Sequence, residues 1–321
     1  MGSRFYGAQD FEPKFFTDGP TRFYLPLFFD IVGQERPALI VTLGLGDAQA
    51  HLAFSQAVVE QNLPSRCVAV RRARGNESAT DDPAWQYAEK TTANFFPNIS
   101  QLIEADAVHA AAGFADGSID VLLIDDVDSG ETVRQELEIW RSKLCVNSLV
   151  LLHGTSLERQ DSPRNAWLNF VAEKAAAYFS DGIGLSVATN SAAAKASAFR
   201  TVLFDETAAL AEGYRLIARS IRARAQTRQA ERRARFFEAR QSLFDTIVED
   251  RTKAQRVIDH QERCLNDLNR KLDAIGAERA EAQLVMNGQF AQIQKMHAKM
   301  TEQKQVLSAA KATCRNKGRC F

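Results

Sequence analysis

Residues 38–54, Ala-Leu-Ile-Val-Thr-Leu-Gly-Leu-Gly-Asp-Ala-Gln-Ala-His-Leu-Ala-Phe, decide the fold of this chain. The apolar run 39–43 has the length of a strand that is buried on both faces. Gly44 and Gly46 follow it, and glycine lets the backbone turn tightly and approach a ligand closely. A helix is expected from about Ala48. The stretch therefore predicts a strand, a glycine turn of the kind that holds a nucleotide, and a helix.

Strands and helices alternate along the next hundred residues. This alternation predicts an α/β fold with a Rossmann-like, doubly wound, mostly parallel sheet. Ligands of such sheets bind at the carboxyl ends of the strands. The expected strands lie at 38–43, 67–70, 99–104, 119–124 and 148–152, and the expected helices at 48–61, 83–95, 106–112 and 131–143.

The first 36 residues are rich in phenylalanine and tyrosine. Thr21 has the chemistry of a helix cap, and Gly33 that of a helix stop. We therefore expect a lid or packing helix between these two residues, before the first strand.

The chain is long enough for more than one structural part, since 321 residues hold one sizeable α/β domain and leave about a hundred over. Its formal net charge is zero, but residues 1–210 carry 17 Lys and Arg against 27 Asp and Glu, whereas residues 211–321 carry 23 against 13. This asymmetry indicates an acidic head and a basic tail. We expect four parts: an aromatic-rich segment and helix at 1–36, an α/β domain at 37–207, a basic helical coiled coil at 208–312, and a basic tail with two cysteines at 313–321.

A heptad pattern runs through the basic tail. With Phe237 as position a, nine of the eleven residues in that column are apolar. Sustained over so many heptads, the pattern predicts a coiled coil that joins copies of the chain. An antiparallel helical hairpin, broken near Gly276 or Gly288, is the competing geometry. The seam is interrupted by polar side chains, which favour a weak or register-restricted coil: Arg251, Gln261, Arg279 and Gln289.

Nine arginines lie between Arg215 and Arg240, a density that also occurs in nucleic-acid-binding helices. Aromatic residues among them are limited to Phe236 and Phe237, which fit the coiled-coil seam instead. Nucleic-acid binding is therefore the weaker interpretation, and a charged helical face is the stronger one.

Five cysteines at irregular spacing, without a Cys-x-x-Cys pair, predict a reducing, cytoplasmic setting. Cys67 and Cys145 lie in or beside apolar runs and fit buried positions. Cys314 and Cys320 bracket a basic tip that fits a disulfide loop, a metal clip or a frayed end. We expect no transmembrane segment, because no run approaches 18 apolar residues.

Several short motifs follow one another in a characteristic order. They are Leu43-Gly44-Leu45-Gly46, Arg66-Cys67-Val68-Ala69-Val70, Gly117 to Asp125, Trp140 to Leu144, Val150 to Thr155, and Gly182-Ile183-Gly184-Leu185. With these motifs, residues 20–190 resemble the class I S-adenosylmethionine (SAM)-dependent methyltransferases. Within them they resemble a family often joined to bacterial glycosyltransferases of surface-polysaccharide assembly.

The resemblance implies a SAM site at the first two strand ends. It places Thr42, Gly44, Gly46, Asp47 and Arg71 at the cofactor. Two of these depart from the family pattern, in which an acid usually stands at Thr42 and another at Arg71. The second acid accepts both ribose hydroxyls of the cofactor, whereas arginine cannot accept a hydrogen bond. Asp47 fits a helix cap as well as a ligand contact.

The arginines after the second strand allow two interpretations. Arg71, Arg72 and Arg74 can grip an anionic ligand in place of the lost carboxylate, or they belong to a solvated loop. The loop is the stronger interpretation.

Asp125 and His153 are the catalytic candidates. Asp125, Asp126 and Asp128 together fit a metal or general-base cluster, or acids that cap a helix. His153 fits a general base or a hydrogen-bonded structural residue. The family's aspartate after this histidine is replaced by Gly154, so we expect no metal. His51 and His109 have no partner in the sequence and are taken as structural.

The resemblance implies a methyl transfer from SAM to a hydroxyl of a sugar, a glycan or a small molecule, with a glycosyltransferase as a possible partner. The eroded motifs leave an alternative open. In that alternative the fold is an inactive scaffold that oligomerises, or recruits glycosyltransferases, through its coiled coil.

Overall fold

The computed structural model describes residues 7–71, 82–125, 129–157, 161–195 and 197–317. The chain divides between Arg232 and Arg233 into two compact units, here called the head and the tail helix. Each is described by itself.

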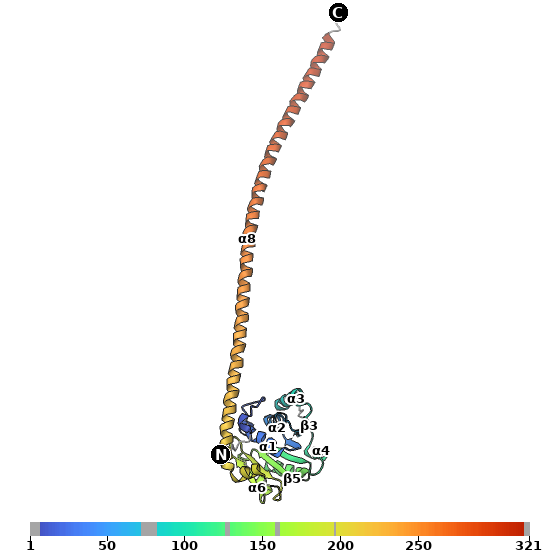
Figure 1. Cartoon of the computed structure of the whole chain (residues 1–321). Coiled ribbons are helices and arrows are strands. Elements are labelled where there is room, and N and C mark those ends of the chain that lie inside the picture. Colours follow the sequence, from blue (N-terminus) through green and yellow to red (C-terminus); the bar gives the residue numbers. More distant parts are fainter. Residues whose placement is uncertain (1–6, 72–81, 126–128, 158–160, 196, 318–321) are drawn as a thin grey trace. The chain divides into compact units, whose positions relative to one another are not determined.

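The head is built on one sheet of seven strands in the order β3-β2-β1-β4-β5-β7-β6 (Figure 1). Strands β1 to β5 run parallel, and β7 and β6 are antiparallel to their neighbours. The order reverses between β1 and β4, and ligands of such sheets bind at the carboxyl ends of the strands beside this reversal. The strands are β1 Leu39–Leu43, β2 Arg66–Arg71, β3 Ser100–Glu104, β4 Ile119–Ile124, β5 Leu144–His153, β6 Ala176–Phe179 and β7 Leu185–Thr189.

Helices cover both faces of this sheet, because successive residues of a buried strand point to opposite sides. In β1, Ile40 packs with α1, α2 and α7, whereas Val41 packs with α4, α5 and α6. The helices are α1 Leu25–Glu35, α2 Gln49–Glu60, α3 Pro83–Phe95, α4 Ala107–Ala112, α5 Gly130–Trp140, α6 Pro163–Val171, α7 Ala198–Asp205 and α8 Thr207–Lys317. Short 3-10 turns lie at Ala8–Asp10, Pro20–Phe23 and Arg141–Lys143.

The predicted Rossmann-like, mostly parallel sheet is confirmed. The predicted start and stop of the first helix are wrong. Thr21 lies inside a 3-10 turn, and α1 continues through Gly33. The missing side chain of Gly33 leaves room for the amide of Gln61, which donates a hydrogen bond of 2.9 Å to the carbonyl of Phe29. The glycine therefore serves packing instead of ending the helix.

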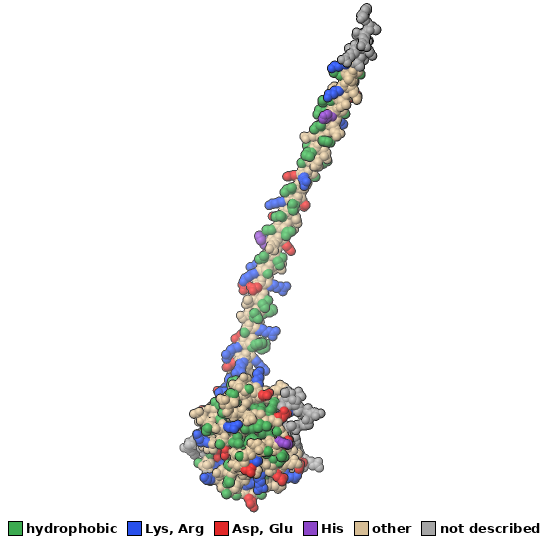
Figure 2. All heavy atoms as spheres, turned by 90° about the vertical axis from the view of Figure 1, so that its right-hand side faces the viewer, with side chains coloured by type: hydrophobic (Ala, Val, Ile, Leu, Met, Phe, Trp, Pro, Cys, Tyr) green, Lys and Arg blue, Asp and Glu red, His purple; other side chains and the backbone are tan. Residues whose placement is uncertain are grey.

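The tail helix is the part of α8 that follows Arg232. It passes through Gly276 and Gly288 without a break, so a hairpin at either glycine is not formed. Its apolar side chains recur along its length and are exposed (Figure 2). In the part of the chain that the structure describes, no helix has the length and apolar character to cross a bilayer.

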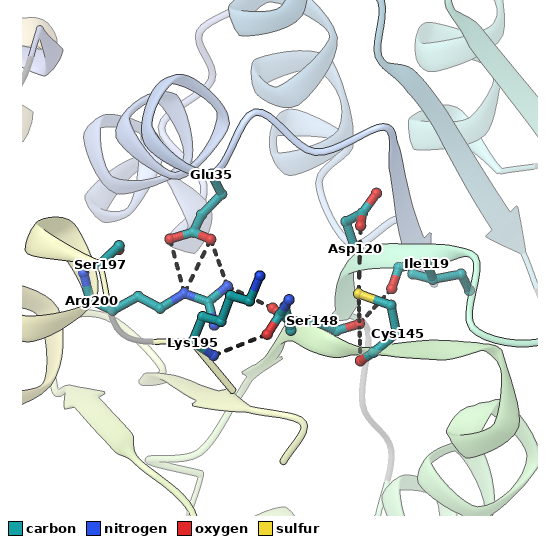
Figure 3. A network of polar contacts seen from close by, with 9 residues as sticks. Glu35, Ile119, Asp120, Cys145, Ser148, Lys195, Ser197 and Arg200 are labelled. Carbon is teal, nitrogen blue, oxygen red and sulfur yellow. Dashed lines mark hydrogen bonds and ion pairs between the residues drawn. The ribbon is translucent and has the colours of Figure 1, made fainter. Parts of the chain in front are cut away.

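A polar network holds helices and strands together in the head (Figure 3). Arg200 of α7 donates three hydrogen bonds of 2.6 to 3.1 Å to the carboxylate of Glu35 in α1. It also donates one of 2.6 Å to the carbonyl of Asn147 in β5. The side chains of Arg200 and Glu35 are only 7% and 14% exposed. Arg200 therefore joins α7, α1 and β5 through contacts that are largely buried.

Candidate active site

The glycine turn after β1 lies where the parallel strands end. Gly44 and Gly46 have φ of 79° and 48°, values that favour glycine. The Gly44 amide donates a hydrogen bond of 2.8 Å to the carbonyl of Val70, and the amide of Asp125 donates one of 2.7 Å to that of Leu43. The turn is therefore fixed to the ends of both neighbouring strands.

Gly46 lies directly against the side chain of Asp125. A Cβ atom at position 46 would be 2.7 Å from Oδ2 of that carboxylate. Only glycine gives Asp125 this room. The structure thus brings the predicted cofactor turn and one predicted catalytic residue together.

Asp125 and His153 form a buried pair. Strands β4 and β5 are parallel with Ile124 opposite Leu152, so the next residue of each strand lies side by side. Nδ1 of His153 is 2.8 Å from Oδ1 of Asp125, and each side chain is at most 4% exposed. Because a carboxylate accepts only, Nδ1 of His153 donates to it, and in the neutral imidazole the lone pair is then on Nε2.

Nε2 of His153 is buried and has no hydrogen-bond partner among the described residues. Buried polar atoms without a partner are rare, and an unmade contact at a strand end is a mark of a site. The ring of Tyr24 stands edge-on to the imidazole, with centroids 5.4 Å apart. Its hydroxyl donates to the carbonyl of Asp181, and burial raises the pKa of Tyr24.

Arg71 is paired with two carboxylates. Its Nη1 lies 2.7 Å from Oε1 of Glu104, and its Nε lies 3.3 Å from Oδ2 of Asp82. Arg71 and Glu104 are opposite each other in the β2–β3 register. The Arg71 side chain is only 12% exposed and is held by these two partners. The carboxylates of Asp82 and Glu104 therefore lie beside the end of β2, where the family has its acid. Arg72 and Arg74 lie outside the described residues.

The two remaining cofactor candidates are Thr42, within β1, and Asp47, just before α2. Thr42 is buried in β1, and its hydroxyl has no hydrogen-bond partner among the described residues. Asp47 accepts hydrogen bonds from the amide of Gln49 at 3.2 Å and from its side chain at 2.8 Å. The N-cap residue of α2 is Ala48, and no side chain caps this helix, so Asp47 contacts the first helical residue without serving as its cap.

A cavity of about 10 Å³ lies beside Gly44, room for about one water molecule. Its walls come from the ends of β1 and β2 and from α4 and α5. In α5, the indole N–H of Trp140 donates a hydrogen bond of 3.0 Å to the carboxylate of Glu136. The lining residues are Leu43, Gly44, Val70, Ala105, Ala107, Glu136 and Trp140.

A larger groove of about 690 Å³ lies elsewhere in the head. Its walls include Glu12, Lys14 and Phe16 of the N-terminal segment and Arg228 and Arg232 of α8. It contains none of the strand-end residues, and Glu12 pairs with Arg228 across it. We therefore place no chemistry there.

Of the remaining sequence candidates, the two histidines have structural contacts, and the two aspartates are not among the residues that the structure describes. His51 is buried with Nε2 2.6 Å from the hydroxyl of Ser100, and burial lowers its pKa to about 4. His109 is exposed and contacts Asp106, which caps α4. Asp126 and Asp128 are outside the described residues, among which no metal-binding group of three side chains occurs.

The sequence interpretation missed Glu104 and Tyr24 as neighbours of the site. The acid at the end of the third strand was visible, but its pairing with Arg71 depends on the strand register. Tyr24 precedes β1 and reaches His153 only in the folded head.

Residues 45–155 match a family model described as a methyltransferase domain. This region, about a third of the chain, is similar to a class I SAM-dependent methyltransferase domain. Over 128 residues the chain is 30% identical to the uncharacterized protein y4gI of Sinorhizobium fredii. This match covers 40% of the chain and only 14% of that curated relative.

Two solved structures have a similar fold. A methyltransferase from Geobacter sulfurreducens is 22% identical, with a TM-score of 0.40 over 54% of this chain and 80% of its own. The O-methyltransferase TomG from Streptomyces achromogenes, in complex with SAM, is 11% identical, with a TM-score of 0.41 over 59% and 88%.

The residues present fit SAM at the glycine turn but not at Arg71. Gly44 and Gly46 leave backbone exposed to a ligand, as a nucleoside site requires. The guanidinium of Arg71 cannot accept ribose hydroxyls, whereas the carboxylates of Glu104 and Asp82 beside it can.

Proposed function

We propose that the head transfers a methyl group from SAM to a hydroxyl of a sugar or another small polar acceptor. The observation that carries this proposal is the buried Nε2 of His153, which Asp125 orients beside Gly46. Deprotonation of an alcohol requires a base that is held in a fixed orientation and has a nitrogen available for the proton. His153 at the end of β5 meets both requirements.

His153 acts as the general base. Asp125 accepts from Nδ1 and fixes the tautomer in which Nε2 has its lone pair available. Nε2 takes the proton of the acceptor hydroxyl as that oxygen attacks the methyl carbon that bound SAM would supply. The sulfur–methyl bond would break in the same step, and S-adenosylhomocysteine would be the leaving group. The Asp125 carboxylate stabilises the imidazolium that results, and burial of the pair strengthens this attraction.

Gly44, Gly46, Asp47 and Thr42 are the residues that would hold the cofactor, with Glu104 and Asp82 in place of the missing ribose acid. Bound SAM supplies an electrophilic methyl group. The role of Arg71 in this arrangement is to position Glu104, which it contacts at 2.7 Å.

The sugar or glycan acceptor, the setting in surface-polysaccharide assembly and the glycosyltransferase partner derive from the sequence resemblance. A cytoplasmic setting agrees with Cys67, Cys145 and Cys264, which are free thiols. Burial raises the pKa of the Cys67 thiol to about 12, so it is inert.

The test is methyl transfer from radiolabelled SAM to a panel of sugars and lipid-free glycans by the full chain. We expect the radiolabelled methyl group to appear in one class of acceptor. The rate of transfer should be about 10²- to 10⁴-fold lower in His153→Gln. His109→Gln, at an exposed histidine away from the strand ends, is the matched control and should retain full activity. Equal activity of both variants would refute the role of His153.

The inactive scaffold is the second candidate, and two observations favour it. Arg71 replaces the ribose acid, and the cavity at Gly44 holds only about one water molecule. A folded chain that binds neither SAM nor S-adenosylhomocysteine would support the scaffold and exclude the methyltransferase.

A further inference from the structure

The tail helix exposes a long apolar stripe. Phe237, Leu265 and Leu272 at position a are 60 to 63% exposed, and Leu268 and Ile275 at position d are 61% and 60% exposed. A helix with such a stripe gains stability by burying it against another helix. The question is which helix, and in which direction.

Six polar residues interrupt the stripe between residues 237 and 303: Arg240 and Gln303 near its ends, and four between them that have a regular spacing. Arg251 and Arg279 occupy position a, and Gln261 and Gln289 occupy position d. The two arginines are separated by the same number of residues as the two glutamines. In a parallel, in-register pair each arginine would face its own copy, and two buried like charges destabilise a seam.

We propose that the tail helix pairs with a second copy of itself in an antiparallel coiled coil whose two-fold axis lies at the level of Arg270. In this register position a of one chain faces position d of the other. Arg251 then faces Gln289 of the second copy, and Arg279 faces Gln261. These four polar seam residues are thereby matched with one another, and a glutamine oxygen can accept from each guanidinium. The two polar residues nearest the ends of the seam are not matched in this way, because Arg240 faces Met300 and Gln303 faces Phe237.

The apolar seam residues are matched in the same register. Large residues face each other near the axis and toward the ends, and the two alanines each face a large residue, which keeps the packing even. The pairs are Leu265 with Ile275, Leu268 with Leu272, Ile247 with Ile293, Phe244 with Met296, Ala254 with Met286, and Ala282 with Ile258.

The flanking positions give independent support. An antiparallel pair brings position g opposite g and position e opposite e. Six apolar residues at these otherwise polar positions fall opposite one another, whereas Leu243 falls opposite Lys299 and Lys271 faces its own copy at the axis. The pairs are Val257 with Val285, Phe236 with Val306, and Val248 with Phe290, and all six side chains are exposed in the single chain.

A shift of one heptad destroys this agreement. Arg251 would then face Ala282 or Met296, and Gln289 would face Phe244 or Ile258. Each shift places polar groups against apolar ones without a partner, at a cost for every buried group. The register at Arg270 is therefore specified by the sequence, and we expect a single dimer. Because the paired segment spans residues 237–303, the two Phe237 residues lie about 100 Å apart.

Cysteine cross-linking tests the direction. Full-length chains with Cys264, Cys314 and Cys320 replaced by serine receive Ile258→Cys or Ala282→Cys. We expect a disulfide-linked dimer under mild oxidation only when the two variants are mixed. Efficient cross-linking of Ile258→Cys with itself would show a parallel pair, and a chain that sediments as a monomer would overturn the proposal.

Charge substitution tests the register. Gln261→Glu combined with Gln289→Glu gives each arginine a carboxylate partner in the proposed dimer, and the dimer dissociation constant should fall about tenfold at low salt. Gln303→Glu is the matched control, because this position faces Phe237. It should weaken the dimer. Weaker association of the double variant would contradict the register.

Discussion

At the residue scale, Gly46 is required for two reasons. Its φ of 48° is costly for other residues, and a Cβ atom would meet Asp125 at 2.7 Å. We expect Gly46→Ala to abolish SAM binding and to lower the free energy of unfolding by more than the ~1 kcal/mol of a glycine turn alone. Gly117→Ala is the control, with φ of 67° and open space around it. Urea unfolding and calorimetry distinguish the two. Equal behaviour would show that Asp125 does not constrain the turn.

Asp125 is predicted to act through His153. Asp125→Asn keeps the shape but offers an amide donor or a weaker acceptor to Nδ1, so the tautomer with Nε2 free is no longer enforced. Methyl transfer should fall by about 10² to 10⁴, with SAM affinity changed by less than about threefold. Steady-state kinetics with calorimetry measure both. A loss confined to SAM affinity would assign Asp125 to cofactor binding instead.

Asp30 makes the stability of the head depend on pH. It is 2% exposed, accepts from the hydroxyl of Tyr214 at 2.8 Å and from the amide of Ala8 at 3.1 Å, and burial raises its pKa to about 6. A raised pKa means that the folded head favours the protonated form. The stabilisation is present below the unfolded pKa of 3.8 and is lost as the pH rises through about 6.

The head should therefore lose about 3 kcal/mol of stability between pH 4 and pH 7 relative to Asp30→Asn, which stays neutral. Urea unfolding of both proteins across this range measures the difference. A difference that does not change with pH would mean that the carboxyl titrates normally.

At the element scale, the ion pair of Arg200 with Glu35 joins α7, α1 and β5. Arg200→Ala leaves the Glu35 carboxylate largely buried without its partner, and the free energy of unfolding should fall by about 3–5 kcal/mol. Arg134→Ala removes an exposed pair with Glu131 in α5 and should cost less than about 1 kcal/mol. Similar losses in thermal and urea unfolding would show that burial does not decide the strength of this contact.

The strands and helices of the head follow from the sequence because apolar runs and glycine turns are local signals. The strand at 119–124 and the helix at 83–95 have the bounds that were predicted. The prediction that Gly33 ends the first helix was wrong, because this glycine makes room for the side chain of Gln61, which is distant in the sequence.

Part of the candidate site also follows from local sequence signals, and part of it does not. Asp125 and His153 were predicted because each ends an apolar strand, and their contact follows from the parallel register. The pairing of Arg71 with Glu104 and the approach of Tyr24 to His153 could not be predicted, because they depend on the strand order and on packing between distant segments.

At the scale of the whole molecule, the head and the tail helix should unfold separately. The tail helix buries its stripe only in the dimer, so its unfolding should depend on protein concentration, whereas that of the head should not. Thermal unfolding followed by helical ellipticity should show two transitions, and the one of the tail helix should shift upward when the protein is concentrated tenfold. A single transition that is independent of concentration would contradict both the division and the dimer.

The central claim is that the head is a SAM-dependent methyltransferase despite Arg71. Isothermal titration calorimetry of the full chain with SAM tests it most directly. The account predicts saturable binding with one site per chain, which is lost in Gly46→Ala and weakened in Glu104→Gln. No heat of binding from a folded chain, at protein concentrations that detect high-micromolar affinity, would contradict the account.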